Sequence, residues 1–131
     1  LRLAQCLYEN EDLHGEPFNF GPPANQNNSV GELVDKIAEN YGDSSWKDIS
    51  EEFDGPYESG LLKLNCDKAL HFLNWHAVWD FNRTVQETSD WYKLFYKQNV
   101  NSIKIKDFSL SQIDAYTDSA KDKQLNWTID D

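Results

Sequence analysis

The chain has 131 residues, 39% of them hydrophobic, and contains five Trp, six Tyr and seven Phe. This composition is typical of one folded domain and excludes a disordered segment. The formal net charge of −11 argues against binding to nucleic acid or to an anionic membrane surface. No apolar run approaches the roughly 20 residues that a membrane-spanning helix needs, and the first residues show no signal-peptide pattern.

The N-terminal residues predict a helix followed by a short strand. Apolar side chains within residues 1–12 recur on one face of a helix: Leu3, Ala4, Leu7 and Tyr8. We expect that helix to end near Gly15. Phe18–Phe20 then alternates apolar and polar residues between Pro17 and Gly21, which predicts a short strand.

A capping box predicts the start of the next helix. Ser29 lies three residues before Glu32 and directly ahead of an apolar run, so both side chains can satisfy backbone N–H groups at a helix N-terminus. The apolar face comprises Val30, Leu33, Val34, Ile37, Ala38 and Tyr41. We expect Gly42 to end this helix. The acidic, turn-rich residues 43–60 follow, with Trp46 as a candidate anchor.

The middle of the chain predicts a strand, a short helix and a long helix. Leu61–Leu64 is typical of a strand and Lys68–Leu73 of a short helix, which Asn74 ends in a turn. A long amphipathic helix opens within residues 80–82. Its predicted apolar stripe is Phe81, Val85, Thr88, Tyr92 and Phe95, widened by Trp91 and Leu94.

A second capping box, Ser109 to Gln112, predicts that a further short helix begins there. Its apolar stripe is Leu110, Ile113, Tyr116 and Ala120. We expect residues 121–131 to be a frayed tail. The elements together predict an α+β fold that is rich in helices and has a few short strands.

These segments, in this order, resemble the C-terminal part of extended short-chain dehydrogenase/reductase proteins. Within that superfamily they are most similar to the CDP-glucose 4,6-dehydratases. The resemblance rests on these motifs: Phe-Asn-Phe-Gly-Pro (18–22), Leu-Asn-Cys-Asp-Lys-Ala (64–69), Leu-Asn-Trp (73–75), Trp-Asp-Phe (79–81), Trp-Tyr (91–92) and Gln-Ile-x-x-Tyr (112–116). Family members commonly carry Gly where this chain has Asn74, and Asn tolerates the left-handed backbone better than most residues.

The resemblance implies a cytoplasmic, NAD-dependent sugar-nucleotide 4,6-dehydratase with a Rossmann-type α/β parent fold. Such an enzyme oxidises the sugar at C4, eliminates water across C5 and C6, and returns the hydride to C6. Residues 1–120 would be its C-terminal substrate-binding domain. The NAD(P)-binding N-terminal domain would lie upstream and form a homo-oligomer.

Two motifs that this chemistry needs are absent from the 131 residues. There is no Gly-rich turn that would let the backbone approach a dinucleotide pyrophosphate. There is also no Tyr four residues before a Lys, the arrangement in which the ammonium lowers the phenol pKa. Since the sequence also contains no Met and starts within a helical stripe, we expect a fragment that binds no NAD and has no activity alone.

The resemblance places a CDP-sugar against the turn at residues 55–60, where Tyr57 and Glu58 are the candidate substrate-binding residues. A Tyr hydroxyl can donate to a phosphate, and a carboxylate can accept from ribose hydroxyls. The family often has His at the position of Tyr57. The alternative interpretation is an ordinary acidic surface turn.

The sequence predicts no metal site. Cys6 and Cys66 lie far apart and match no zinc spacing, so we expect two reduced, buried thiols. The three histidines share no helical face at the spacing of metal ligands: His14, His71 and His76.

Two other functions stay open at this point. The first is a related sugar-nucleotide epimerase or reductase of the same superfamily. The second is a secreted carbohydrate-binding module that uses exposed aromatic side chains. Against the second, we expect core packing for three tryptophans of the patterned region: Trp75, Trp79 and Trp91.

Overall fold

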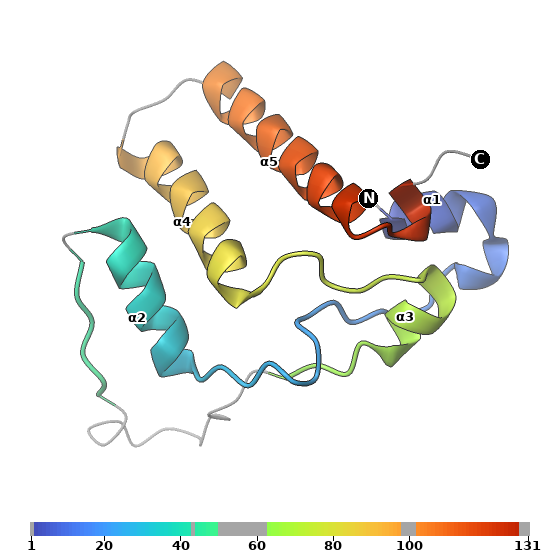
Figure 1. The fold of residues 1–131 in the computed structure, drawn as a ribbon, viewed down its shortest axis with the longest axis horizontal. Coiled ribbons are helices and arrows are strands. Elements are labelled where there is room, and N and C mark those ends of the chain that lie inside the picture. Colours follow the sequence, from blue (N-terminus) through green and yellow to red (C-terminus); the bar gives the residue numbers. More distant parts are fainter. Residues whose placement is uncertain (1, 43, 50–62, 98–101, 129–131) are drawn as a thin grey trace. The chain divides into compact units, whose positions relative to one another are not determined.

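A computed structural model describes residues 2–42, 44–49, 63–97 and 102–128 (Figure 1). Of the described residues, 65% are helical. The elements in chain order are α1 (Arg2–Glu9), η1 (Glu11–Leu13), α2 (Val30–Tyr41), α3 (Asp67–Leu73), α4 (Phe81–Lys97), α5 (Ser102–Asp122) and η3 (Asn126–Thr128). The chain divides into two compact units. Unit 1 comprises Leu1–Gln26, Lys63–Asp80 and Ala115–Asp131, and unit 2 comprises Asn27–Leu62 and Phe81–Asp114.

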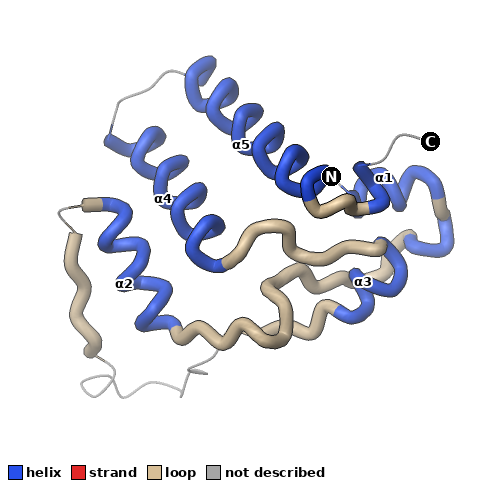
Figure 2. The backbone as a smooth tube through the Cα atoms, viewed as in Figure 1, coloured by secondary structure: helices blue, strands red, loops and turns tan. Residues whose placement is uncertain are grey.

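The predicted α+β fold is wrong, because the described residues form helices and loops without a β-strand (Figure 2). Phe18–Phe20 is a loop. Pro17 and the prolines after Gly21 have no backbone N–H, so they cannot donate to a neighbouring strand. A side chain makes the link instead, since Asn19 Nδ2 donates to the Asn65 carbonyl at 3.2 Å.

The second predicted strand, Leu61–Leu64, is only partly within the described residues. Lys63 and Leu64 are loop, and the two leucines before them lie outside the described part. A strand needs a partner for its backbone groups. Just after these residues, the backbone N–H of Asp67 donates to a side chain rather than to a second strand, since its acceptor is Asn65 Oδ1 at 2.8 Å.

Helix α1 is shorter than the predicted stretch of residues 1–12. It ends at Glu9, because Asn10 caps a separate 3-10 turn by accepting a hydrogen bond from the Asp12 N–H at 3.0 Å. The predicted stripe is confirmed in part. Leu3 and Leu7 pack against the core, but Ala4 and Tyr8 are exposed and Cys6 is buried instead.

The first core cluster of unit 1 joins α1, η1 and α3. Its buried members are Cys6, Leu13, Ala69 and Leu73, and Leu3, Leu7, Phe18 and Trp75 pack against them. The guanidinium of Arg2 reaches the end of α3, where its Nε donates to the Leu73 carbonyl at 3.0 Å. Asn74 then takes a left-handed φ of 48°, as the comparison with Gly at this position predicted. The turn places Trp75 against Phe20 in an edge-to-face contact at 4.8 Å.

The second core cluster of unit 1 lies around the C-terminal end of α5. Its buried members are Val78, Ala120 and Leu125, and Trp79, Tyr116 and Trp127 pack against them. Part of the segment 121–131 is therefore packed in the core, because Leu125 is 8% exposed. Lys123 Nζ also donates a hydrogen bond to the Val78 carbonyl, which links the residues after α5 to this cluster.

In unit 2, α2 packs against α4. The predicted capping box is confirmed. Ser29 Oγ accepts from the Glu32 N–H at 3.2 Å, and Glu32 Oε2 accepts from the Ser29 N–H at 2.7 Å. Gly42 ends α2 with φ of 77°, as predicted.

The predicted apolar stripe of α4 is confirmed only in part. Val85 is buried, and Trp91 and Leu94 are half-buried, but Tyr92 and Phe95 are 46% and 49% exposed. The deepest side chain of this helix is Ser89, at 2% exposed. The predicted stripe placed Thr88 on the buried face of this turn, but Thr88 is exposed and its neighbour Ser89 is buried.

Helix α5 starts at Ser102, seven residues before the predicted capping box, so Ser109 lies inside the helix. Its hydroxyl donates to the Ile105 carbonyl at 2.9 Å and accepts from Trp91 Nε1 at 2.9 Å. A Ser inside a helix commonly binds a carbonyl one turn back in this way. Gln112 Nε2 donates to the Glu87 backbone carbonyl at 2.7 Å, and so links α5 to α4 within unit 2.

Candidate functional site

The two predicted substrate contacts, Tyr57 and Glu58, lie outside the described residues and stay predictions. The described residues that next follow them along the chain begin at Lys63. That side chain is fixed, since Lys63 Nζ donates to the Ala24 carbonyl at 2.8 Å. The loop that carries the Phe-Asn-Phe-Gly-Pro motif thus lies beside the loop that starts Leu-Asn-Cys-Asp, and two of the segments on which the resemblance rests are neighbours in unit 1.

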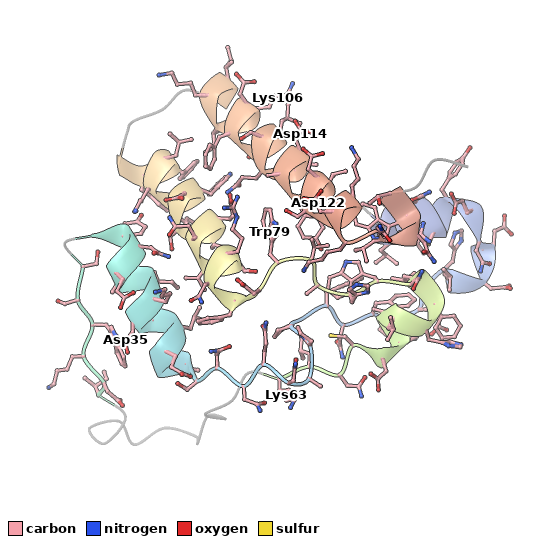
Figure 3. The ribbon with its side chains drawn as sticks, viewed as in Figure 1. Asp35, Lys63, Trp79, Lys106, Asp114 and Asp122 are labelled. Carbon is pink, nitrogen blue, oxygen red and sulfur yellow. The ribbon has the colours of Figure 1, made fainter. Side chains whose placement is uncertain are left out.

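Aromatic side chains converge on the C-terminal part of α5 in unit 1. Trp79 points toward α5 (Figure 3), and its Nε1 donates to Ser119 Oγ at 3.1 Å. Its ring meets the ring of Tyr116 edge-to-face, with 5.0 Å between the ring centroids. The ring of Trp127 stacks on Tyr116 at 6.4 Å. The prediction that Trp75 and Trp79 serve core packing is confirmed, because both pack against buried clusters.

The hydroxyl of Tyr116 is the one group in this aromatic cluster with a perturbed proton affinity. Burial raises its pKa above the usual value of 10.0, because the phenolate would lose solvation. Hydrogen bonds with the backbone of Val78 and the side chain of Trp75 act in the opposite direction. A raised pKa keeps this hydroxyl protonated at neutral pH, so that it can donate a hydrogen bond.

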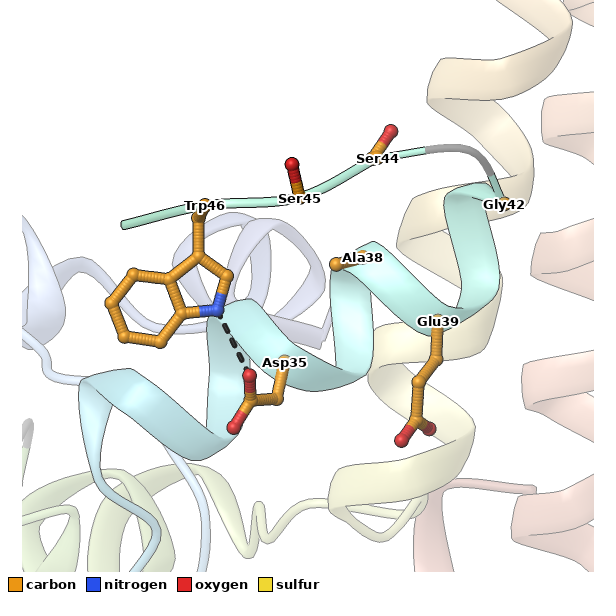
Figure 4. Close-up of a pocket in the computed structure, with 7 residues that line it drawn as sticks. All are labelled: Asp35, Ala38, Glu39, Gly42, Ser44, Ser45 and Trp46. Carbon is orange, nitrogen blue, oxygen red and sulfur yellow. Dashed lines mark hydrogen bonds between the residues drawn. The ribbon is translucent and has the colours of Figure 1, made fainter. Parts of the chain in front are cut away.

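An open pocket of about 640 Å³ lies on unit 2 beside α2 (Figure 4). Its lining residues are Asp35, Ala38, Glu39, Gly42, Ser44, Ser45 and Trp46. The indole of Trp46 points to α2, where its Nε1 donates to Asp35 Oδ1 at 2.9 Å. The ring packs near the start of α2, where a Cβ added at Gly31 would be in ordinary van der Waals contact with the indole at 3.8 Å. The prediction that Trp46 anchors its segment is confirmed.

The pocket presents hydrogen-bond acceptors rather than cationic groups. Asp35 and Glu39 lie one turn apart on α2, so their carboxylates extend from the same side of the helix. The nearby Lys36 binds Glu39 Oε2 at 2.9 Å. The wall is therefore unsuited to the phosphates of a nucleotide, which need converging donors and positive charge.

Sequence reasoning missed this pocket, although one signal was present. A Trp within a polar and acidic stretch must pack against something, and Trp46 was named only as an anchor. Its partner could not be named, because Asp35 lies eleven residues away across a change of chain direction.

Two of the histidines make local contacts. His14 Nε2 forms a hydrogen bond with the Leu7 carbonyl at 2.8 Å, and His71 meets Phe72 edge-to-face at 4.7 Å. Within the described ranges, no three His, Cys, Asp or Glu side chains are grouped so that they could hold a metal ion. Cys6 and Cys66 are free thiols, of which the first is buried and the second half-buried.

A comparison with known proteins found one similar enzyme. Over 96 residues, or 72% of this chain, 33% of positions are identical to CDP-glucose 4,6-dehydratase of Salmonella typhimurium. The chain resembles the CDP-glucose 4,6-dehydratases. The match confirms the resemblance predicted from the motifs. The aligned region spans only 26% of the Salmonella dehydratase, about a quarter of its length.

The other comparisons gave no match. No family model matches the chain, and no solved structure does either. None of the helices described is both long and apolar enough to cross a lipid bilayer. A function can be argued from the similarity to the Salmonella dehydratase.

Proposed function

We propose that this chain is the sugar-nucleotide-binding portion of an NAD-dependent CDP-glucose 4,6-dehydratase, a lyase of nucleotide-sugar metabolism. The observation that carries the proposal is 33% identity over 96 residues to the Salmonella enzyme of that name. The paired loops of unit 1 support it, because they join two of the motifs shared with that family. The enzyme would act in the cytoplasm as a homo-oligomer.

In this proposal the chain supplies walls of the substrate pocket and the rest of the enzyme supplies the chemistry. The sequence has neither a Gly-rich dinucleotide turn nor a Tyr-x-x-x-Lys pair, so NAD and the catalytic residues belong to the remainder of the protein. Tyr57 would donate to a phosphate of the CDP-sugar, and Glu58 would accept from a ribose hydroxyl. Lys63 and its bond to Ala24 would hold the end of that segment in place.

The test uses the full-length protein that contains this sequence, incubated with CDP-glucose and NAD. A dehydratase converts the substrate to a product lighter by one water, and NAD is not consumed because the hydride returns to the sugar. A related epimerase would leave the mass unchanged. A reductase would give no product in this mixture, because it needs a keto sugar and reduced cofactor. Either of these outcomes would contradict the proposed activity.

The 131-residue chain by itself allows a second test. We expect calorimetric titration with NAD to give no saturable binding, since the dinucleotide turn is absent. CDP-glucose should bind weakly, because only part of its pocket is present and the chain carries a net charge of −11. Micromolar affinity for NAD would show that the assignment of cofactor binding to the rest of the enzyme is wrong.

A further inference from the structure

The pocket beside α2 has a lining whose chemistry selects for a particular charge. Its polar side chains are two carboxylates, Asp35 and Glu39, and two hydroxyls, Ser44 and Ser45. Carboxylates only accept hydrogen bonds, and hydroxyls accept as readily as they donate. The indole N–H of Trp46 would be the strongest donor, but it is already bound to Asp35 Oδ1 at 2.9 Å. A ligand that fits this lining must therefore supply the donors itself.

Charge excludes anionic ligands from the same pocket. Among the described lining residues, none is Lys or Arg. Lys36, which neighbours Asp35 in the chain, has its ammonium on Glu39 Oε2 at 2.9 Å and so lowers the negative charge there only in part. The chain as a whole carries −11, which attracts cations and repels phosphates. A sugar nucleotide, with its two phosphates, is the wrong ligand for this wall.

The aromatic wall adds a preference for organic cations over simple metal ions. Trp46 is 43% exposed, so much of its ring surface is open to solvent while its N–H edge is held. Trp is the aromatic side chain that attracts an ammonium or guanidinium group most strongly through its ring face. Ala38 contributes an apolar surface against which an aliphatic stem can pack. Carboxylate, indole face and methyl group together match a cation on a short carbon chain.

We propose that this pocket binds an alkylammonium or alkylguanidinium group, with the charge on Asp35 and Glu39 and the stem along Trp46 and Ala38. Such a group comes either from a free amine or from a Lys or Arg side chain of a partner protein. A neutral sugar fits less well, because it brings no positive charge to pair with the carboxylates of Asp35 and Glu39. The inference uses neither Tyr57 nor Glu58, so it does not depend on the proposed dehydratase function.

The test follows the indole N–H signals of the intact 131-residue chain by NMR during titration. Trp46→Phe identifies the Trp46 signal by its loss, and the other four tryptophans report whether the fold is kept. The probes are butylammonium for a free amine, acetyl-Gly-Arg-Gly-amide for a protein side chain, methyl glucoside as a neutral sugar and inorganic phosphate as an anion. We expect saturable shifts of the Trp46 signal with the two cations, weaker at higher salt, and none with glucoside or phosphate. Tighter binding of the amine or of the peptide identifies the source of the cation.

Three variants separate a built site from general attraction to an acidic protein. Asp35→Asn keeps an oxygen that can accept from Trp46 but removes the charge, and should weaken cation binding about fivefold. Lys36→Ala frees Glu39 and should strengthen it about two- to fivefold. Lys121→Ala is the matched control, because Lys121 makes a similar exposed pair with Asp118 outside the pocket, and should leave the affinity unchanged. The proposal is overturned if the cations give no saturable shift, if glucoside or phosphate binds instead, or if Lys121→Ala strengthens binding as much as Lys36→Ala.

Discussion

Replacing Leu73 by Ala tests whether α3 is held by the first core cluster of unit 1. Leu73 is fully buried among Cys6, Leu13 and Ala69. The substitution removes three carbon atoms, which costs roughly 2.4 kcal/mol in lost transfer free energy at about 0.8 kcal/mol per buried methylene. The cavity left behind raises the total to about 3–4 kcal/mol, within the usual range for a buried Leu. The backbone carbonyl that Arg2 binds is retained.

Leu70→Ala is the matched control, because Leu70 lies on the same helix and is 50% exposed. Both substitutions change helix propensity equally, so their difference reports burial alone. Half-exposure and the absence of a cavity predict a cost of about 1 kcal/mol for Leu70→Ala. The two variants should therefore differ by about 2 kcal/mol in the free energy of unfolding.

Urea unfolding followed by both circular dichroism and tryptophan fluorescence measures this difference. With a slope of about 1–3 kcal/mol per molar urea, the midpoint of Leu73→Ala should lie about 1 M below that of Leu70→Ala. Equal midpoints for the two variants would show that α3 does not bury the face described. A lower midpoint for Leu70→Ala would mean that the helix is rotated and the cluster wrongly composed.

Three further predictions concern a helix cap, a titration and the proposed substrate contacts. Ser29→Ala should cost about 0.5–2 kcal/mol in thermal or urea unfolding, since it removes the acceptor for the Glu32 N–H; no loss would contradict the capping role. Tyr116→Phe should reduce the loss of stability above about pH 10. The pKa of Tyr116 is raised in the folded protein, so its contribution to stability is fully present below the pKa of the unfolded state and is lost as pH rises through the pKa of the folded state. Identical alkaline profiles for the two proteins would refute it. In the full-length enzyme, Glu58→Ala should raise KM for CDP-glucose about ten- to hundredfold with a smaller change in kcat, because a ribose contact is alike in ground and transition states. Tyr57→Phe should raise KM less. An unchanged KM in both variants would show that neither residue contacts the substrate and that residues 55–60 are an ordinary surface turn.

Local signals predicted the elements whose ends are fixed by neighbouring residues. The helix from Val30 to Tyr41 is an example, because Ser29, Glu32 and Gly42 determine its ends from within a few positions. The turn at Asn74 is another, since its left-handed backbone follows from residue type. In both cases the physical cause lies inside the window that a sequence pattern can read.

Elements whose outcome depends on distant partners were predicted less well. Phe18–Phe20 alternates like a strand, but a strand needs a second backbone beside it, and Asn65 supplies only a carbonyl to a side chain. Ser109 and Gln112 match a capping box, yet the chain upstream is already helical and both side chains bind other groups. The pocket beside α2 was missed for the same reason, because its lining depends on where the chain returns after Gly42.

The long-range bonds of unit 1 have a consequence for the order in which the protein folds. Arg2 binds the end of α3 across 71 residues of sequence, and Trp79 binds Ser119 across 40. Because contacts between distant residues require the closing of large loops, they form slowly. During synthesis, the cluster of Val78, Ala120 and Leu125 cannot form until the residues up to Leu125 have left the ribosome. Helix α2, whose cap needs only four consecutive residues, can form long before that, so we expect it to be present in the earliest folding species.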